Sequence, residues 1–267
     1  MKEFYSTLSS LVYGNNMFYY CSNLSDFSSD LSSLVYGDYM FTKCKQFHDF
    51  HLFYDSLSSL VSGTDMFQGC ENLTSFTFKL PSLTNGSRMF YDTNLASFNV
   101  DLPSLTSGGS MFEYCYKLTS FSSNLSSLTD GYGMFNNCTK LTSFNGDLPS
   151  LTIGGSMFQS CENLTSFSSD LPSLTNGDGM FSSCTKLTSF SSDLPSLTNG
   201  GSMFHNCTNL KSFNGDLSSL TYGGYMFNRT KLDAQSVMYI VHSIKDIAAE
   251  KLLYTNGTIP YVSIVNG

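Results

Sequence analysis

The 267-residue sequence is poor in charge, because charged residues make up only 13% of it. Its 13 Lys and Arg residues form no basic run, which disfavours nucleic acid as a partner, since phosphate binding needs clustered cations. No apolar stretch approaches the roughly 20 residues of a membrane span. The opening MKEFYSTLSS lacks the apolar core of a signal peptide, so export needs a signal on a longer precursor or another route, such as release with a virus particle.

Several chemical motifs are missing as well. No C-x-x-C pair is present, which disfavours zinc, and no G-x-S-x-G elbow marks a nucleophile. The Gly-rich turns recur once per repeat, so they predict structural turns and not a phosphate loop. We therefore expect a protein without enzymatic activity, cofactor or metal.

A repeat dominates the sequence. The dipeptide Met-Phe occurs ten times, with methionines Met17, Met40, Met66, Met89, Met111, Met134, Met157, Met180, Met203 and Met226. The intervals are 23, 26, 23, 22 and then 23 residues five times. A period in the low twenties is typical of leucine-rich repeats, with one coil per repeat. The sequence predicts a solenoid of the leucine-rich-repeat type, mainly β with short α or 3₁₀ turns.

One period reads M-F-x-x-C-x-x-L-T-S-F-x-x-D-L-P-S-L-T-x-G-x-x, and the coil that starts at Met157 follows it almost unaltered. T-S-F-x-x-D-L predicts a short strand, because Phe167, Ser169 and Leu171 alternate inward. One such strand per coil makes neighbouring strands parallel. D-L-P-S-L predicts a short helical or 3₁₀ turn, with Asp as its cap and Pro in its first turn.

The two ends of the chain differ. We expect residues 1–230 to form a solenoid of about ten coils and residues 231–267 to form a C-terminal cap, a helix followed by the strand IPYVSIV. Asp233 is the expected N-cap. The apolar stripe of the helix is Val237, Ile240, Val241, Ile244 and Ile247. The N-terminus begins within a repeat and predicts an uncapped coil, which either continues upstream or meets another chain.

The repeat units MFNNCTKLTSF and MFSSCTKLTSF resemble the BspA-like leucine-rich repeats of bacterial surface proteins, over about residues 4–230. That resemblance implies a right-handed coil and an extracellular adhesion or recognition module. Similar repeats also occur in phage and prophage structural proteins, whose arrays end in segments similar to KLDAQSVMYIVHSIKDI. The resemblance indicates the fold but not the ligand, since function depends on the site.

The cysteines follow the repeat. They are Cys21, Cys44, Cys70, Cys115, Cys138, Cys161, Cys184 and Cys207. Each lies four residues after a repeat Met, which predicts a buried ladder of reduced thiols. Disulfides between coils are disfavoured, because parallel side-chain vectors fit the bond poorly.

Two polar columns suggest chemistry but have simpler explanations. The first column is Asp30, Asp101, Asp147, Asp170, Asp193 and Asp216. It could bind calcium, but Lys79 fills the same position in one coil, which favours turn caps. The second is Thr74, Thr119, Thr142, Thr165 and Thr188. A threonine array suggests ice binding, but Ala96 and Lys211 interrupt it, which favours ordinary strand propensity.

The coil KCKQFHDFHLFYDSL is three residues longer than the others and holds His48 and His51. A metal site is conceivable there, and so is a bulge that repacks aromatic side chains. A third hypothesis follows from the tendency of insertions in repeat arrays to mark loops on the binding face. In that case Phe53 and Tyr54 are candidate contact residues.

Tyrosine at variable positions gives the broadest functional indication. The candidate ligand-binding residues are Tyr19, Tyr20, Tyr36, Tyr39, Tyr91, Tyr114, Tyr116 and Tyr132, together with His48, His51, Phe53 and Tyr54 of the longer coil. Tyr offers large contact area at small entropic cost, although it could equally shield coil edges. The leading hypothesis is a cell-surface or phage-tail module that binds a protein or glycan. The alternative is a structural component of a fibre or virion that assembles with itself.

Overall fold

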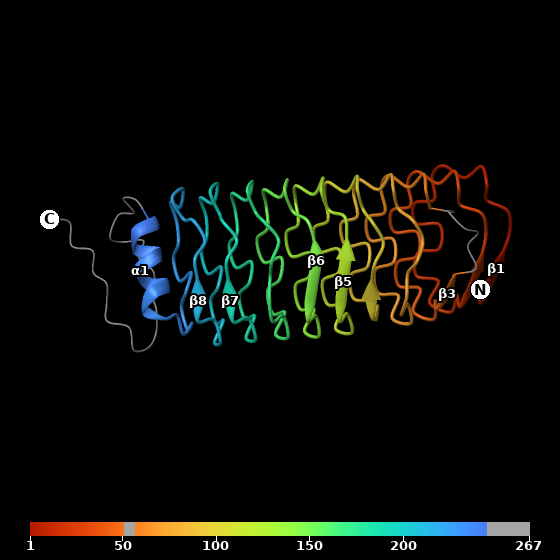
Figure 1. The fold of residues 1–267 in the computed structure, drawn as a ribbon. Helices are drawn as coiled ribbons and strands as arrows, with labels where there is room; N and C mark the ends of the chain where they lie inside the picture. The colour runs from red at the N-terminus through yellow and green to blue at the C-terminus, as the bar shows by residue number, and fades with distance from the viewer. Residues whose placement is uncertain (51–56, 245–267) are drawn as a thin grey trace.

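The computed structural model describes residues 1–50 and 57–244, which form one elongated rod of stacked coils (Figure 1). The elements are β1 (Glu3–Tyr5), β2 (Asp26–Ser28), β3 (Asp49–Phe50), β4 (Ser97–Phe98), β5 (Ser120–Ser123), β6 (Ser143–Gly146), β7 (Ser189–Phe190), β8 (Ser212–Phe213) and α1 (Ala234–Ser243). The predicted leucine-rich-repeat solenoid, with short parallel strands and a C-terminal helix, is confirmed.

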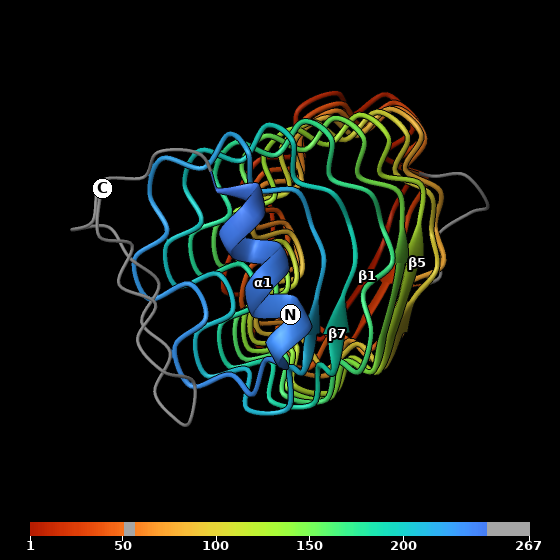
Figure 2. The ribbon, with the colours of Figure 1, turned by 60° about the vertical axis from the view of Figure 1, so that its left-hand side comes forward.

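The strands of successive coils pair in parallel along one side of the rod (Figure 2). Phe121 of β5 lies opposite Phe144 of β6, so equivalent repeat positions stack in register. Both strands alternate exposed and buried residues, as a period of two requires. Phe167, Ser169 and Leu171 lie outside the named strands and are buried in the same alternation. The predicted inward set is therefore confirmed.

A second parallel ladder, which the sequence did not predict, runs where each coil turns back from the strand side. Single bridges join Tyr13 to Tyr36 and continue coil by coil to Tyr222. From Asn85 onward a threonine precedes each bridging residue, and in the first three coils a valine does. The Thr175 amide and its hydroxyl both donate to the Thr152 carbonyl at 3.0 Å. Each coil is thus tied to the next on two sides.

The segment D-L-P-S-L forms one hydrogen-bonded turn and not a helix, since the Leu174 amide donates to the Leu171 carbonyl at 3.3 Å. The predicted Asp cap depends on the next residues. Asp216 accepts from the Ser218 amide at 2.8 Å, and Asp30 accepts from Ser32 in the same way. Where Pro takes the place of that Ser, it has no N–H to offer. The cap is therefore limited to coils with Ser at this position.

The chain then runs back through a return segment, from the Gly three residues before the repeat Met to four residues after it. In residues 131–138, alternate amides donate to the next coil, among them Gly133 to Gly155 at 2.9 Å and Phe135 to Met157 at 2.8 Å. Gly133 and Asn137 have left-handed φ angles of 60° and 62°. The residues between them close i+3 turns, so each return segment is a rigid chain of turns.

Phenylalanine ladders form the centre of the rod. Phe158 stacks on Phe135 at 5.3 Å and on Phe181 at 5.4 Å between ring centroids. Its edge meets Phe144 of the strand column at 5.0 Å, with planes 75° apart. Such edge and offset contacts stabilise aromatic pairs beyond simple burial. The core is therefore continuous from coil to coil.

All eight cysteines are free thiols, and seven are buried. The Cys161 thiol donates to the Phe135 carbonyl of the preceding coil at 3.2 Å. Each of the other buried thiols donates in the same way to a Phe carbonyl of the coil before it. Burial raises the pKa of the Cys44 thiol to about 12. The predicted ladder of reduced thiols is confirmed.

The helix α1 lies across the last coil (Figure 2). Asp233 caps it by accepting from the Ser236 amide at 2.8 Å, and Ile240 is buried against the coil, as predicted. The expected strand IPYVSIV and Ile247 lie outside the described residues. Among the residues described, no helix has the length and apolar character needed to cross a membrane.

Candidate recognition surface

The two long faces of the rod carry different side chains. The strand face presents small polar residues, and its exposed positions in β5 and β6 are Ser120, Ser122, Ser143 and Asn145. The face formed by the return segments, here called the return face, carries most of the tyrosines predicted to bind. Because small side chains offer little contact area, the return face is the better candidate for recognition.

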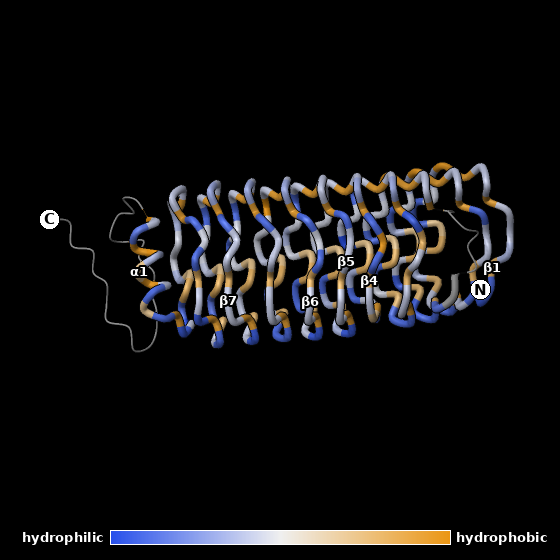
Figure 3. The backbone as a smooth tube through the Cα atoms, in the orientation of Figure 1, coloured by the Kyte–Doolittle hydropathy of each residue, from blue (hydrophilic) through white to orange (hydrophobic). Residues whose placement is uncertain are grey.

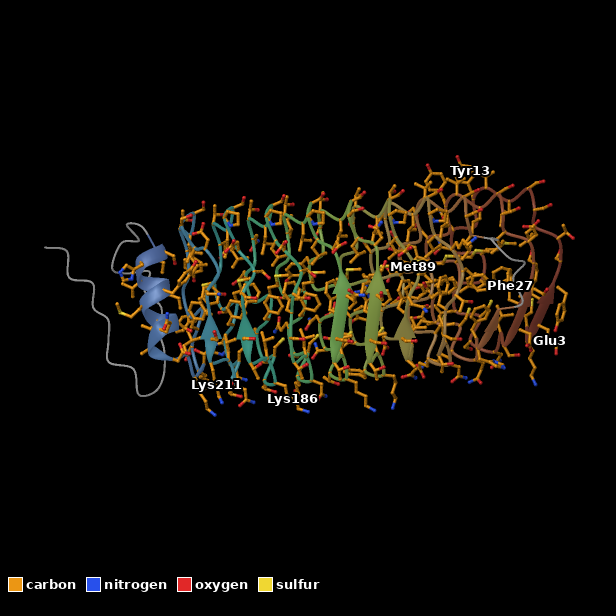
Figure 4. The ribbon with its side chains drawn as sticks, in the orientation of Figure 1. Glu3, Tyr13, Phe27, Met89, Lys186 and Lys211 are labelled. Atoms are coloured by element: carbon orange, nitrogen blue, oxygen red, sulfur yellow. The ribbon has the colours of Figure 1, made fainter. Side chains whose placement is uncertain are left out.

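The first two coils hold an N-terminal tyrosine group, defined as Tyr13, Tyr19, Tyr20, Tyr36 and Tyr39. The Tyr13 and Tyr36 rings stack at 5.2 Å with planes 8° apart, and Figure 4 places Tyr13 at the upper edge of the rod. The Tyr19 and Tyr20 rings are 4.6 Å apart. All five are exposed, from 37% for Tyr36 to 69% for Tyr13. The exposed rings of these five tyrosines can therefore contact a partner.

Three of the tyrosines occupy left-handed backbone positions of the repeat. Tyr20, Tyr39 and Tyr114 have left-handed φ angles of 58°, 59° and 62°. The same two repeat positions are left-handed in every coil, and elsewhere they hold Ser, Asp, Arg or Lys as well as Gly and Asn. A left-handed conformation costs a residue other than Gly or Asn roughly 1–2 kcal/mol. The repeat therefore imposes this conformation whatever the side chain, and Tyr is accepted there at that cost.

A central tyrosine group lies on the fourth and fifth coils, defined as Tyr91, Tyr114 and Tyr116. The Tyr91 ring meets Tyr114 edge-on at 5.3 Å, and Tyr114 lies 5.8 Å from Tyr116. The Arg88 guanidinium sits 3.9 Å from the centroid of the Tyr91 ring, and its Nε donates to Asp65 at 2.8 Å. Arg88 is thus held over the Tyr91 ring by Asp65, which positions both side chains.

The phenol groups of Tyr91 and Tyr116 stay protonated at neutral pH. Burial raises the pKa of Tyr91, and the nearby Glu113 carboxylate raises it further. Burial also raises the pKa of Tyr116, with a smaller contribution from Tyr114. Each phenol can therefore donate a hydrogen bond to a ligand while its ring supplies contact area.

Tyr132 lies in the sixth coil, separate from both groups, and is 56% exposed. Its ring covers bare backbone, since a Cβ on Gly155 would lie 3.1 Å from the ring carbon Cδ2 of Tyr132. Tyr132 thus shields a coil edge, which is the other role that the sequence left open for tyrosine. The same rod therefore contains both uses of this residue type.

His48 lies at the other edge of the rod from Tyr13. His48 occupies the repeat position of Lys211, which Figure 4 shows at the edge opposite Tyr13, and its Nδ1 lies 2.8 Å from the Gln46 carbonyl oxygen. His51, Phe53 and Tyr54 lie outside the described residues. Within the described part of the chain, no group of three or more His, Cys, Asp or Glu side chains could hold a metal ion.

Sequence reasoning missed Arg88 and Asp65 as members of the central group. Arg88 precedes its repeat Met directly, and Tyr91 follows that Met by two residues. Nothing in that local spacing indicates that the two side chains stack. Asp65 takes the equivalent position in the preceding coil, so the period of the repeat was the signal that could have joined it to Arg88.

Comparison with known proteins agrees with the coil geometry. The family model described as a BspA type leucine rich repeat region (6 copies) matches residues 3–78, 56–165 and 131–252. The chain belongs to the BspA-type leucine-rich repeat family. None of the curated proteins matches this BspA-type chain.

Two solved structures are similar to this BspA-type chain. A leucine-rich repeat protein from Bacteroides ovatus is 19% identical, with 96% of this chain and 83% of that chain covered and a TM-score of 0.44. A leucine rich cell surface protein from Faecalibacterium prausnitzii is 18% identical, with 91% and 69% covered and a TM-score of 0.41. The family assignment rests on the repeat model.

Proposed function

We propose that this BspA-type chain is a non-enzymatic recognition module of a cell surface or a virion, which binds a protein or glycan through the tyrosines of its return face. One observation carries the proposal: tyrosines gather in two groups whose rings contact one another, one in the first two coils and one in the fourth and fifth. Recognition surfaces favour Tyr, because its ring offers area with little rotamer entropy to lose.

The rigid return segments support this function in a second way. Each side chain on the return face stands on a backbone hydrogen-bonded to the next coil, so the two tyrosine groups keep a fixed separation of about three coils, roughly 15 Å at the usual strand spacing. Pre-positioned contact residues lose less entropy on binding. An extended partner that lies along the rod axis can reach both groups.

The test measures binding of the labelled protein to intact bacterial cells, to mucin and to host-cell matrix. A variant with Tyr19→Ser, Tyr20→Ser and Tyr36→Ser should lose at least tenfold in affinity, since central aromatic contacts cost 2 kcal/mol or more when truncated. The control variant carries Tyr222→Ser in the last coil and should bind as the parent does. Unchanged binding by the triple variant, with circular dichroism intact, refutes the assignment of this surface.

A second candidate function is self-assembly into a fibre or virion component. It is favoured by the apolar surface of the first coil, where Val12 and Met17 are 39% and 43% exposed although Met40 and later repeat methionines are buried. Sedimentation over a range of protein concentrations separates the two functions. Assembly that grows with concentration supports the structural role, and a monomer at every concentration rules it out.

A further inference from the structure

The lower edge of the rod consists of the positions five to eight residues after each repeat Met. Four lysines that are far apart in the sequence lie in one row along this edge. Lys117, Lys140 and Lys186 share the sixth position, and Lys211 takes the eighth. Figure 4 shows Lys186 and Lys211 at this edge, with their side chains directed away from the rod. All four lysines are exposed. The fold thus makes a basic row in a chain whose net charge is −8.

These lysines differ from those of the second coil. Lys45 is paired with Glu71 at 2.6 Å, and Lys43 lies 4.0 Å from Asp92. Among the described residues, no carboxylate lies within ion-pair distance of the row lysines. The Lys186 ammonium instead donates to the Asn163 amide oxygen at 2.6 Å, in the coil between two lysines of the row. The row therefore carries uncompensated positive charge.

The other side chains of this edge are mostly neutral hydrogen-bonding groups. From the fifth coil to the ninth they are Tyr116, Thr119, Thr139, Thr142, Glu162, Asn163, Thr165, Thr185, Thr188, Thr208 and Asn209. Glu162 is the single carboxylate among them. Hydroxyl and amide groups beside cations can bind a partner that combines negative charge with many hydroxyls. Figure 3 shows these lower turns as largely hydrophilic.

The spacing of the charges indicates which kind of polyanion fits. Coils lie about 4.8 Å apart, so Lys117 and Lys140 are separated by about 5 Å and Lys140 and Lys186 by about 10 Å. Duplex DNA carries a charge every 1.7 Å or so along its axis, and each strand one about every 3.4 Å. A nucleic acid would leave most of its phosphates uncompensated on this row. A linear glycan with a carboxylate on every sugar, or on every second sugar, has the sparser charge that the row requires.

We propose that the lower edge between the fifth and ninth coils is a second binding site, which adjoins the return face at Tyr116, for a linear glycan that bears carboxylate groups. The row lysines pair with carboxylates, and the Thr and Asn side chains bond to hydroxyls between them. The glycan lies parallel to the rod axis, so each added coil extends the same site.

Hyaluronan and polygalacturonate are the probes, and neutral dextran is the control polymer. We expect the parent protein to bind both acidic polymers at low salt and to lose affinity as salt is added. The variant with Lys117→Gln, Lys140→Gln and Lys186→Gln should bind them roughly tenfold more weakly, since each exposed ion pair contributes up to about a fivefold change. Glu162→Gln should strengthen binding.

Matched variants make the test specific. Replacing the same three lysines by Arg keeps the charge and should preserve binding. Removing charge elsewhere, with Lys2→Gln and Lys43→Gln, should leave binding within twofold of the parent. The proposal is overturned if the row variant binds hyaluronan as the parent does, or if single-stranded poly(dT) binds more tightly than both acidic glycans. The Tyr19, Tyr20 and Tyr36 variant should bind both glycans normally, which separates this site from the return face.

Discussion

Phe158→Ala tests whether the phenylalanine ladder holds the coils together. The Phe158 side chain is fully buried between two stacked rings and two edge contacts. Truncating a buried Phe to Ala costs about 3–5 kcal/mol, because transfer energy is lost and a cavity remains. We expect the free energy of unfolding to fall by about 4 kcal/mol, which corresponds to a loss of roughly 8–16 °C in Tm for a chain of this size.

The position of Phe158 also predicts which other coils lose stability when it is truncated. Stability in a solenoid is a sum of coil and nearest-neighbour terms, so a weak middle coil loosens both of its neighbours. Phe18→Ala is the control: Phe18 stacks on the single ladder neighbour Phe41, and its loss should free the first coil alone. Amide hydrogen exchange resolved along the chain measures both effects. Equal protection losses in the two variants, or an unchanged Tm for Phe158→Ala, would refute the nearest-neighbour reasoning.

Three further predictions concern the backbone, the cap and the thiols. Gly215→Ala places a Cβ 2.6 Å from the Ser192 carbonyl oxygen and should destabilise by about 1–3 kcal/mol, whereas Gly109→Ala, with nothing nearer than 3.8 Å, should be neutral in urea unfolding. Ser236→Ala leaves a buried amide of β8 without its acceptor at 3.0 Å and should cost about 1–3 kcal/mol, seen as faster exchange of that amide. Burial raises the pKa of Cys115 from 9.0 to about 11, so the unfolded chain ionises first and the urea midpoint should fall as pH rises through this range. A urea midpoint that stays unchanged across this pH range would contradict the burial of protonated thiols in the folded chain.

Much of the coil could be predicted from sequence, because burial and period are local patterns. Phe167, Ser169 and Leu171 alternate as a strand must, and the fixed offset of Cys161 from Met157 predicted a buried thiol. The return segment was harder. Its left-handed positions hold residues such as Tyr20, which do not indicate that conformation in a sequence. The turns of the return segment are therefore set by hydrogen bonds to the neighbouring coil and not by local preference.

The candidate surfaces, too, could be predicted from the sequence only in part. Exposure of the tyrosines could be predicted, since they fall outside the buried repeat positions. The contact of Arg88 with Tyr91 could not, because it depends on how two turns of one return segment fold. The lysine row was missed for another reason: Lys117 and Lys140 are 23 residues apart, so a search for local basic runs does not detect them.

Alternate amides of each return segment donate toward the C-terminal end of the rod. The return segments at the two ends of the rod therefore offer different hydrogen-bonding groups. In the second coil the carbonyls of Tyr36 and Met40 accept from Gly14 and Phe18 at 2.7 and 2.9 Å. The equivalent carbonyls of the first coil, such as that of Met17, have no such donor among the described residues. Along their return segments, two rods that met at these edges would bring acceptor to acceptor, so these segments cannot hydrogen-bond head to head. A polypeptide can extend the ladder here only by presenting N–H groups at every second residue.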